Sequence, residues 1–282
     1  MRIGLVGLGR IGSFHARTLL ELEAVTDLVV TDVVPWVTAG IAAELGVVIS
    51  DSPEDLLTAG LDGVVIASST STHPQLLLAF VEAGIPTFCE KPVAANLSEA
   101  LAVRDKATAH NVAVQIGFPR RFDPDMVRAR NDLRSGRLGT LHTLRSTTLD
   151  PAPPPAAYVA DSGGIFRDCA IHDFDTVRWV TRSRGRRGLL RGVQQHRRLR
   201  RRCPGRRHCN LRADPRRRCD RGRVQRTSQG RGHDVRLELL GTDDSVAAGL
   251  DDTLPLRSVN LERGIDVDHV TLFDGFSDSR PY

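Results

Sequence analysis

One glycine-rich turn constrains the fold of this chain more than any other feature. An apolar, strand-like run at residues 2–7 leads into "GLGRIG", which contains Gly7, Gly9 and Gly12, and helical apolar spacing follows from residue 10. In such a turn one glycine permits the sharp bend, one lets the backbone approach a pyrophosphate, and one allows close helix–strand packing. The N–H groups at the start of the helix then bind the phosphates. The pattern predicts a dinucleotide-binding α/β domain.

The region after this turn alternates strands and helices as such a domain requires. Strand-like runs at 2–7, 27–32, 63–68, 86–90 and 112–117 alternate with helical segments at 10–22, 73–84 and 98–110. Another helix begins after Ser52, which can cap it, with Pro53 in its first turn. Continuous Val, Ile and Leu runs are typical of strands covered on both faces. We therefore expect a doubly wound parallel sheet over residues 1–118.

The cofactor-binding residues follow from the same motif. Asp32 ends the second strand-like run, 20 residues after Gly12. A carboxylate at this position accepts hydrogen bonds from the adenosine ribose and repels a 2′-phosphate, which favours NAD over NADP. Arg10 and Ile11, inside the motif, are further candidates. In the alternative interpretation the glycines serve only packing and Asp32 only ends a strand.

Composition limits the remaining possibilities. Its 282 residues, 40% of them hydrophobic, are enough for one large or two ordinary domains. Apolar runs are too short to span a bilayer, and the N-terminus enters a strand rather than a signal peptide. The five cysteines have no paired spacing, which predicts a cytoplasmic protein with reduced thiols.

Three further motifs resemble one enzyme family. "CEKP", which ends at Pro92, resembles the Gfo/Idh/MocA oxidoreductases, and "GFPRRFDPD" with "DPAPPPAAYVADSGGIFRDCAIHDFD" is most similar to inositol 2-dehydrogenases. The resemblance covers 1–179 and 232–259. It implies that a Rossmann domain at 1–118 precedes an α+β open-sheet domain at 119–282 for substrate binding and dimerisation. It also implies a homo-oligomer that uses NAD to oxidise a secondary hydroxyl of a cyclic polyol such as myo-inositol.

A helical segment near residue 170 carries candidate catalytic side chains. Asp168 and His172 are four residues apart and share a helix face. Histidine has a suitable pKa for removing a hydroxyl proton, and a nearby carboxylate fixes its tautomer. The resemblance implies that both meet Lys91, which stabilises the negative charge on the reacting oxygen. The alternative is a solvated Asp–His pair on a surface helix.

Weaker candidates surround these residues. By resemblance, Arg121 and Asp175 contact substrate hydroxyls, although Arg121 could instead form an interdomain ion pair. Glu90, Thr72 and His73 are expected at the cofactor, and a helix-start role is an equal alternative for Thr72 and His73. Cys169 is interpreted as a small core residue rather than a nucleophile.

Residues 182–231 depart from the family pattern. They contain 20 arginines, two acidic residues and no aromatic residue, whereas the other positions contain 32 acidic and 19 basic residues. No secondary element is predicted there, and the composition is typical of GC-rich DNA read out of frame. The pattern predicts a substrate domain that lacks strands, is protease-sensitive and has at best weak activity. Order returns at 234–241, where Val235, Leu237 and Leu239 predict a half-buried strand, although the C-terminus is short for the family.

Other functions fit the sequence less well. Arginine clusters bind nucleic acid, but this segment lacks aromatic residues for base stacking and a recognition-helix pattern. Cys203, His208, Cys209 and Cys219 lack zinc-ligand spacing, so no metal site is expected. Two alternatives stay open: a sugar or sugar-acid dehydrogenase of the same family, and a non-catalytic NAD-binding remnant.

Overall fold

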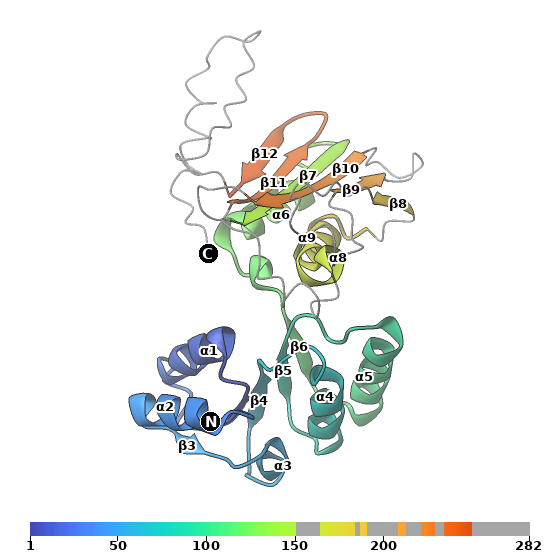
Figure 1. The fold of residues 1–282 in the computed structure, drawn as a ribbon. Helices are drawn as coiled ribbons and strands as arrows, with labels where there is room; N and C mark the ends of the chain where they lie inside the picture. Colours follow the sequence, from blue (N-terminus) through green and yellow to red (C-terminus); the bar gives the residue numbers. More distant parts are fainter. Residues whose placement is uncertain (151–163, 184–186, 191–207, 213–220, 229–233, 250–282) are drawn as a thin grey trace, which may run out of the picture. The chain divides into compact units, whose positions relative to one another are not determined.

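The computed structural model describes residues 1–150, 164–183, 187–190, 208–212, 221–228 and 234–249. The chain divides into a first unit, Met1–Phe118, and a second unit, Pro119–Tyr282. Each unit is built around one six-stranded sheet (Figure 1).

The first unit contains a parallel sheet in the order β3-β2-β1-β4-β5-β6. Its elements are β1 (Arg2–Val6), α1 (Arg10–Leu20), β2 (Asp27–Thr31), α2 (Pro35–Leu45), β3 (Val48–Ile49), α3 (Pro53–Leu56), β4 (Gly63–Ile66), α4 (His73–Glu82), β5 (Thr87–Glu90), α5 (Leu97–His110) and β6 (Val114–Gly117). This strand order reverses direction at β1, where dinucleotides bind in doubly wound folds. The predicted fold class is confirmed.

Helices cover both faces of the first sheet (Figure 1). One apolar cluster joins Leu5 and Val30 to Ala16 of α1 and to partly buried side chains of α2. A second cluster joins Ile66 to Phe80 of α4. Burial on both faces explains why the strands read as continuous apolar runs.

Local signals account for much of this unit, with two omissions. The Ser52 hydroxyl accepts a hydrogen bond from the Asp55 N–H at 3.2 Å, as the predicted cap requires. The two-residue edge strand β3 and the helix α2 were not predicted. β3 is too short for periodicity to reveal it, and α2 is apolar nearly all round, so it carries no amphipathic signal.

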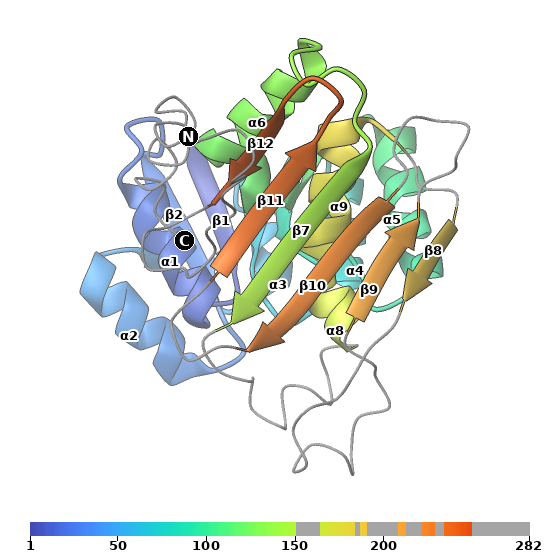
Figure 2. The ribbon, with the colours of Figure 1, turned by 90° about the horizontal axis from the view of Figure 1, so that it is seen from above.

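The second unit begins with the 3₁₀ turn η1 (Pro119–Arg121) and contains a mixed sheet in the order β12-β11-β7-β10-β9-β8. Its helices are α6 (Pro124–Arg134), α8 (Ile165–Asp168) and α9 (Ala170–Thr181), and its strands are β7 (Thr143–Asp150), β8 (Arg187–Leu190), β9 (His208–Arg212), β10 (Arg221–Ser228), β11 (Asp234–Leu240) and β12 (Ser245–Ala248). Figure 2 shows α6, α8 and α9 behind one face of the sheet. A core cluster between these helices and the sheet includes Met126, Leu144, Val180 and Leu237.

The arginine-rich segment corrects the sequence prediction. It supplies three strands, where none was expected, and β10 pairs with β7 in parallel over eight residues. A β ladder is made by backbone N–H and C=O groups, so a strand can form without the apolar periodicity that predicts it. The expected loss of sheet strands is therefore wrong for 187–190, 208–212 and 221–228. The segment's other residues from 184 to 231 lie outside the described residues.

Strand β11 is present as predicted, but its burial differs from simple alternation. Leu237 and Leu239 are buried and Val235 is partly buried, as expected. However, the polar positions Asp234 and Arg236 are buried too, because the guanidinium donates two hydrogen bonds to the carboxylate at 2.6 and 2.8 Å. A buried charge is tolerated when it is paired in this way.

Candidate active site

The glycine turn has the geometry of a phosphate cradle. Gly7 has a φ of +92°, and a Cβ on it would lie 2.6 Å from the backbone of Ser68. A Cβ on Gly12 would lie 1.9 Å from the Gly7 carbonyl oxygen, so the start of α1 packs directly on the turn. In contrast, a Cβ on Gly9 would meet nothing within 4 Å, which leaves open space beside the backbone. These three environments match the three predicted glycine roles.

The N-terminus of α1 is suited to an anion. Its N-cap, Gly9, has no side chain to bond the first N–H groups, and its first turn contains no acidic residue. Helix N-terminal N–H groups lack intrahelical partners and attract negative charge. Arg10 and Ile11 lie exposed in this turn, where the sequence places cofactor contacts.

Asp32 supports the turn from the end of β2. Its Oδ2 accepts the Leu8 N–H at 2.6 Å and its Oδ1 accepts the Val34 N–H at 2.9 Å. Each carboxylate oxygen can accept more than one hydrogen bond, so these contacts leave capacity for ribose hydroxyls. The arrangement fits NAD, because the same carboxylate shapes the glycine turn and lies where an adenosine ribose is expected.

Thr72 and His73 lie at the start of α4. The buried His73 ring bonds two carbonyl oxygens, with Nδ1 2.7 Å from Pro92 O and Nε2 3.1 Å from Ser68 O. The Thr72 hydroxyl bonds the Ser68 hydroxyl at 2.7 Å and donates to Ser69 O at 2.9 Å. Both positions agree with the helix-start alternative, and His73 also ties this helix to the segment that follows Lys91.

Glu90 has a partner that sequence reasoning missed. His15 of α1 lies with its Nε2 2.8 Å from Glu90 Oε1, and its ring meets Phe88 edge-on. The pair joins the helix of the glycine turn to the end of β5, immediately before Lys91. The sequence shows His15 in the helical segment that follows the glycine turn, but only the fold shows that His15 lies beside Glu90.

The catalytic candidates of the second unit are arranged differently from the predicted single helix. Asp168 ends α8 and His172 lies in the first turn of α9, with a turn at Cys169 between them. Their sequence spacing therefore does not by itself place them on one helix face. The Cys169 thiol contacts Asp168 Oδ2 at 3.4 Å, and both candidate side chains are half-buried. Lys91 belongs to the first unit.

Arg121 and Asp175 lie together within the second unit. Arg121 Nε donates to Asp175 Oδ2 at 2.8 Å and a second guanidinium nitrogen donates to Oδ1. The hydrogen bonds to Asp175 raise the pKa of Arg121, so the guanidinium stays charged. The ion pair expected for Arg121 exists, but it lies within one unit rather than between domains. Arg121 keeps 43% of its side-chain area exposed, which leaves it accessible.

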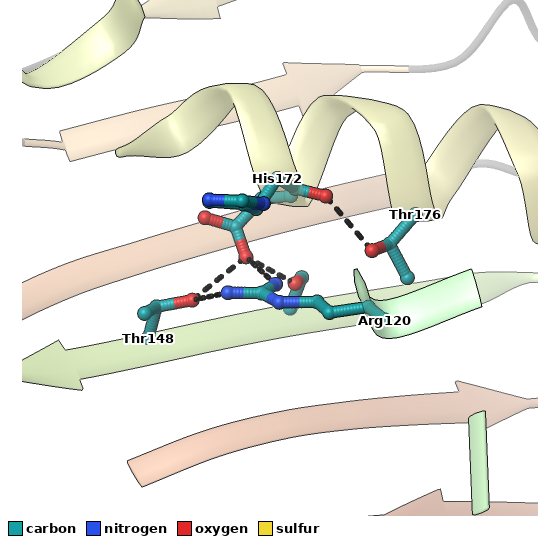
Figure 3. A network of polar contacts seen from close by, with 6 residues as sticks. Arg120, Thr148, His172 and Thr176 are labelled. Carbon is teal, nitrogen blue, oxygen red and sulfur yellow. Dashed lines mark hydrogen bonds and ion pairs between the residues drawn. The ribbon is translucent and has the colours of Figure 1, made fainter. Parts of the chain in front are cut away.

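A buried polar cluster lies under His172 and was not predicted. Asp173 is fully buried, and its Oδ1 accepts hydrogen bonds from Arg120, Ser146 and Thr148. Figure 3 shows Arg120 and Thr148 reaching toward the part of α9 that carries His172. The sequence signal was the pair of hydroxyl residues two apart in "RSTT", which share one face of a strand.

Thiols and metals add little to this site. Burial raises the pKa of the Cys89 thiol, so it stays protonated at neutral pH. Over the described ranges no three His, Cys, Asp or Glu side chains gather as a metal site would need, while Cys203 and Cys219 lie outside those ranges. Within the same ranges, none of the helices has the length and apolarity needed to cross a membrane.

The strand order, the glycine turn and Asp32 define the first unit as a dinucleotide-binding domain. Residues 1–118 match the model "Oxidoreductase family, NAD-binding Rossmann fold", and residues 126–197 match "GFO/IDH/MocA C-terminal domain". The chain belongs to the Gfo/Idh/MocA oxidoreductase family, and its first unit is the NAD-binding domain.

Relatives of known sequence agree with this assignment. The chain is 35% identical to inositol 2-dehydrogenase 1 of Saccharopolyspora erythraea, over 93% of this chain and 78% of that protein. It is 38% identical to myo-inositol 2-dehydrogenase of Thermotoga maritima over 64% of this chain, which spans only 54% of that relative. The chain thus spans about half the length of several curated relatives that it matches.

Solved structures show the same fold. The scyllo-inositol dehydrogenase of Lactobacillus casei, solved with NAD(H) and scyllo-inositol, is similar with a TM-score of 0.81 and 27% identity, over 93% of this chain and 80% of that one. A myo-inositol dehydrogenase of Corynebacterium glutamicum gives 0.79 and 30%, over 93% and 79%.

Proposed function

We propose that this chain oxidises one secondary hydroxyl of a cyclic polyol of the inositol class to a ketone, with NAD as the hydride acceptor. The observation that carries the proposal is the cradle at Gly7, Gly9 and Gly12, supported by the Asp32 carboxylate. Inositol is proposed because relatives named as inositol dehydrogenases match most of both units.

The chain's own residues supply the proton chemistry. His172 takes the proton of the reacting hydroxyl, and Asp168 orients its ring and stabilises the imidazolium. Lys91 donates a hydrogen bond to the same oxygen and stabilises the negative charge that develops there. NAD, when bound, supplies the electrophilic carbon that receives the hydride.

Arg121 and Asp175 are proposed to hold neighbouring hydroxyls. The guanidinium donates and the carboxylate accepts, so together they match a hydroxyl, which does both. As an ion pair they carry no net charge, which favours a neutral polyol over a sugar acid. The neutral Arg121–Asp175 pair therefore supports an inositol as the substrate over a sugar acid.

The test combines binding with turnover. Calorimetry measures NAD and NADP affinity of the full chain, and NADH formation is followed with myo-inositol, scyllo-inositol, glucose and gluconate as substrates. We expect NAD to bind more tightly than NADP and the inositols to be oxidised fastest. Faster oxidation of glucose or gluconate would support the sugar or sugar-acid alternative and reject the inositol assignment.

A non-catalytic NAD-binding protein is the second candidate. It is favoured by residues 182–231, whose composition departs from both units and which contain most of the chain's arginines. NAD binding with no turnover on any of the four substrates would select it. Homo-oligomerisation and a cytoplasmic location remain predictions from the sequence, to be tested by light scattering and by cell fractionation.

A further inference from the structure

The buried cluster around Asp173 connects three elements at one oxygen atom. Asp173 Oδ1 accepts from Arg120 Nη1 at 2.7 Å, from the Ser146 hydroxyl at 2.6 Å and from the Thr148 hydroxyl at 2.9 Å. Arg120 also donates from Nη2 to the Thr148 oxygen at 2.7 Å. One carboxylate therefore links α9 with η1 and with β7 (Figure 3).

The two ends of α9 are held by different interactions. Its C-terminal end packs into the apolar core through Val180, with Val177 and Trp179 partly buried against the same core. Its N-terminal end contributes the small residue Ala170 to a minor cluster with Phe166 and Phe174, which are only partly buried. The apolar core thus anchors the far end of the helix, and the polar cluster anchors the end that carries His172.

This anchor acts on the residue next to it. His172 directly precedes Asp173, and neighbouring side chains on a helix differ in direction by about 100°. Fixing Asp173 therefore fixes the rotation of the first turn and the direction in which His172 leaves it. The turn at Cys169 interrupts the helix just before this point, so α8 does not provide a continuous helical support. The Thr176 hydroxyl donates to the His172 carbonyl at 2.8 Å, which further ties this turn together.

We propose that Asp173, Arg120, Ser146 and Thr148 are positioning residues that set the orientation of the His172 imidazole. The inference rests on the proposed function only in calling His172 the general base. None of the four is proposed to touch substrate or cofactor. The charges of Arg120 and Asp173 compensate each other, so the cluster fixes geometry without adding net charge beside His172.

Thr148 is the most informative position to change. Thr148→Val keeps the shape of the side chain but removes the hydroxyl that both donates to Asp173 and accepts from Arg120. Thr148→Ser restores that hydroxyl. Thr147→Val is the matched control, because Thr147 is the next residue of the same strand, only half-buried and on the opposite face.

The experiment measures turnover and the His172 ring in the full chain. We expect Thr148→Val to lower kcat by about tenfold to 100-fold, since small displacements of a catalytic group have effects of this size. KM and NAD affinity should stay nearly unchanged. The ¹⁵N signals of His172, assigned with His172→Gln, should move in Thr148→Val, and Thr148→Ser should restore both signals and kcat. Ser146→Ala should give the same changes at smaller size if Thr148→Val fails to fold.

The outcomes separate this inference from the proposed function. If the unmodified chain shows no turnover, the ¹⁵N signals alone decide: a shift in Thr148→Val but not in Thr147→Val supports positioning. Unchanged His172 signals in a folded Thr148→Val or Ser146→Ala protein would overturn the proposal. Equal effects of Thr147→Val and Thr148→Val would overturn it as well.

Discussion

The two units hold their functional groups in place by different means. In the first unit, apolar strands covered on both faces fix a glycine turn whose predicted ligand contacts are mostly backbone groups. In the second unit, the site candidates are side chains, and buried ionic and hydroxyl groups such as Asp173 and Asp234 lie among the apolar residues. The comparison teaches that close backbone packing fixes the predicted cofactor turn, whereas individual hydrogen bonds position the candidate catalytic side chains.

The largest expected effect is at the glycine turn. Gly12→Val should abolish measurable NAD binding, because its Cβ would overlap the Gly7 carbonyl oxygen at 1.9 Å and the turn would have to open. Gly40→Ala in α2 is the control, since a Cβ there meets nothing within 4 Å. That control should bind NAD normally and be more stable by about 0.5–1 kcal/mol. Calorimetry measures the NAD affinity of both variants. Normal NAD affinity in Gly12→Val would contradict the interpretation of the glycine turn as a phosphate-binding cradle.

The second effect is on turnover alone. His172→Ala should lower kcat by about 10²–10⁴-fold, the usual contribution of a general base, while NAD affinity stays nearly intact. The control His142→Ala changes an exposed histidine of the same unit and should leave both quantities unchanged. Steady-state kinetics with inositol, together with NAD titration, make the measurement. If His172→Ala keeps most of its turnover, the assignment of the base is wrong.

The third effect concerns stability in the second unit. Asp234→Ala should lower the free energy of unfolding by about 3–5 kcal/mol, because it leaves Arg236 buried without its carboxylate. Glu238 lies on the same strand as Asp234 and forms a more exposed ion pair with Arg145 of β7. Glu238→Ala breaks that pair and should lower the free energy of unfolding by less than about 1 kcal/mol. Urea denaturation of both variants tests whether the buried ion pair stabilises this unit more than the exposed one. Similar losses in the two variants would contradict that view.

A smaller effect is expected at Asp32. Asp32→Ala should weaken NAD binding by about tenfold, the equivalent of about 1.4 kcal/mol, and should reduce discrimination against NADP. Asp51→Ala, at an exposed carboxylate in the same unit, is the control. Titration with both nucleotides gives the ratio of affinities. Tighter binding of NADP than of NAD by the unmodified chain would refute the proposed preference.

The smallest effect is a pH dependence in the first unit. Burial raises the pKa of Cys89 far above its ordinary value of 9.0, so above pH 9 the unfolded chain loses this proton while the folded chain keeps it. Stability from this group is therefore full below pH 9 and falls as pH rises, by at most about 1.4 kcal/mol per pH unit. Denaturation at pH 8 and pH 10 of the unmodified chain and of Cys89→Ala should show a steeper loss in the unmodified chain. Equal slopes would mean that this thiol does not contribute.

The two units also differ in how much their sequence predicts. In the first unit, apolar periodicity and the glycine turn predict the sheet, and Ser52 predicts a helix start, because each signal is local. The partner of Glu90 was not predictable, because His15 lies 75 residues away in the sequence and only the fold brings the two side chains together.

In the second unit, periodicity predicts less. Asp234 and Arg236 resemble a solvent-facing pair in the sequence, and only the fold shows that they form a buried ion pair. The break at Cys169 was missed, because "FRDCAIHDF" contains no proline and no interrupting glycine. The three strands of the arginine-rich segment form by backbone pairing with β7 and with one another, which side-chain patterns do not report.

The most direct test of the account follows the hydride itself. The full chain is incubated with NAD and with myo-inositol that carries deuterium on its ring carbons, and the nicotinamide product is analysed by mass spectrometry. The account predicts reduced cofactor one mass unit heavier than that formed from unlabelled inositol, and none from His172→Ala in the same time. Tight NAD binding by the unmodified chain without any labelled product would contradict the central claim that this chain is an NAD-dependent inositol dehydrogenase.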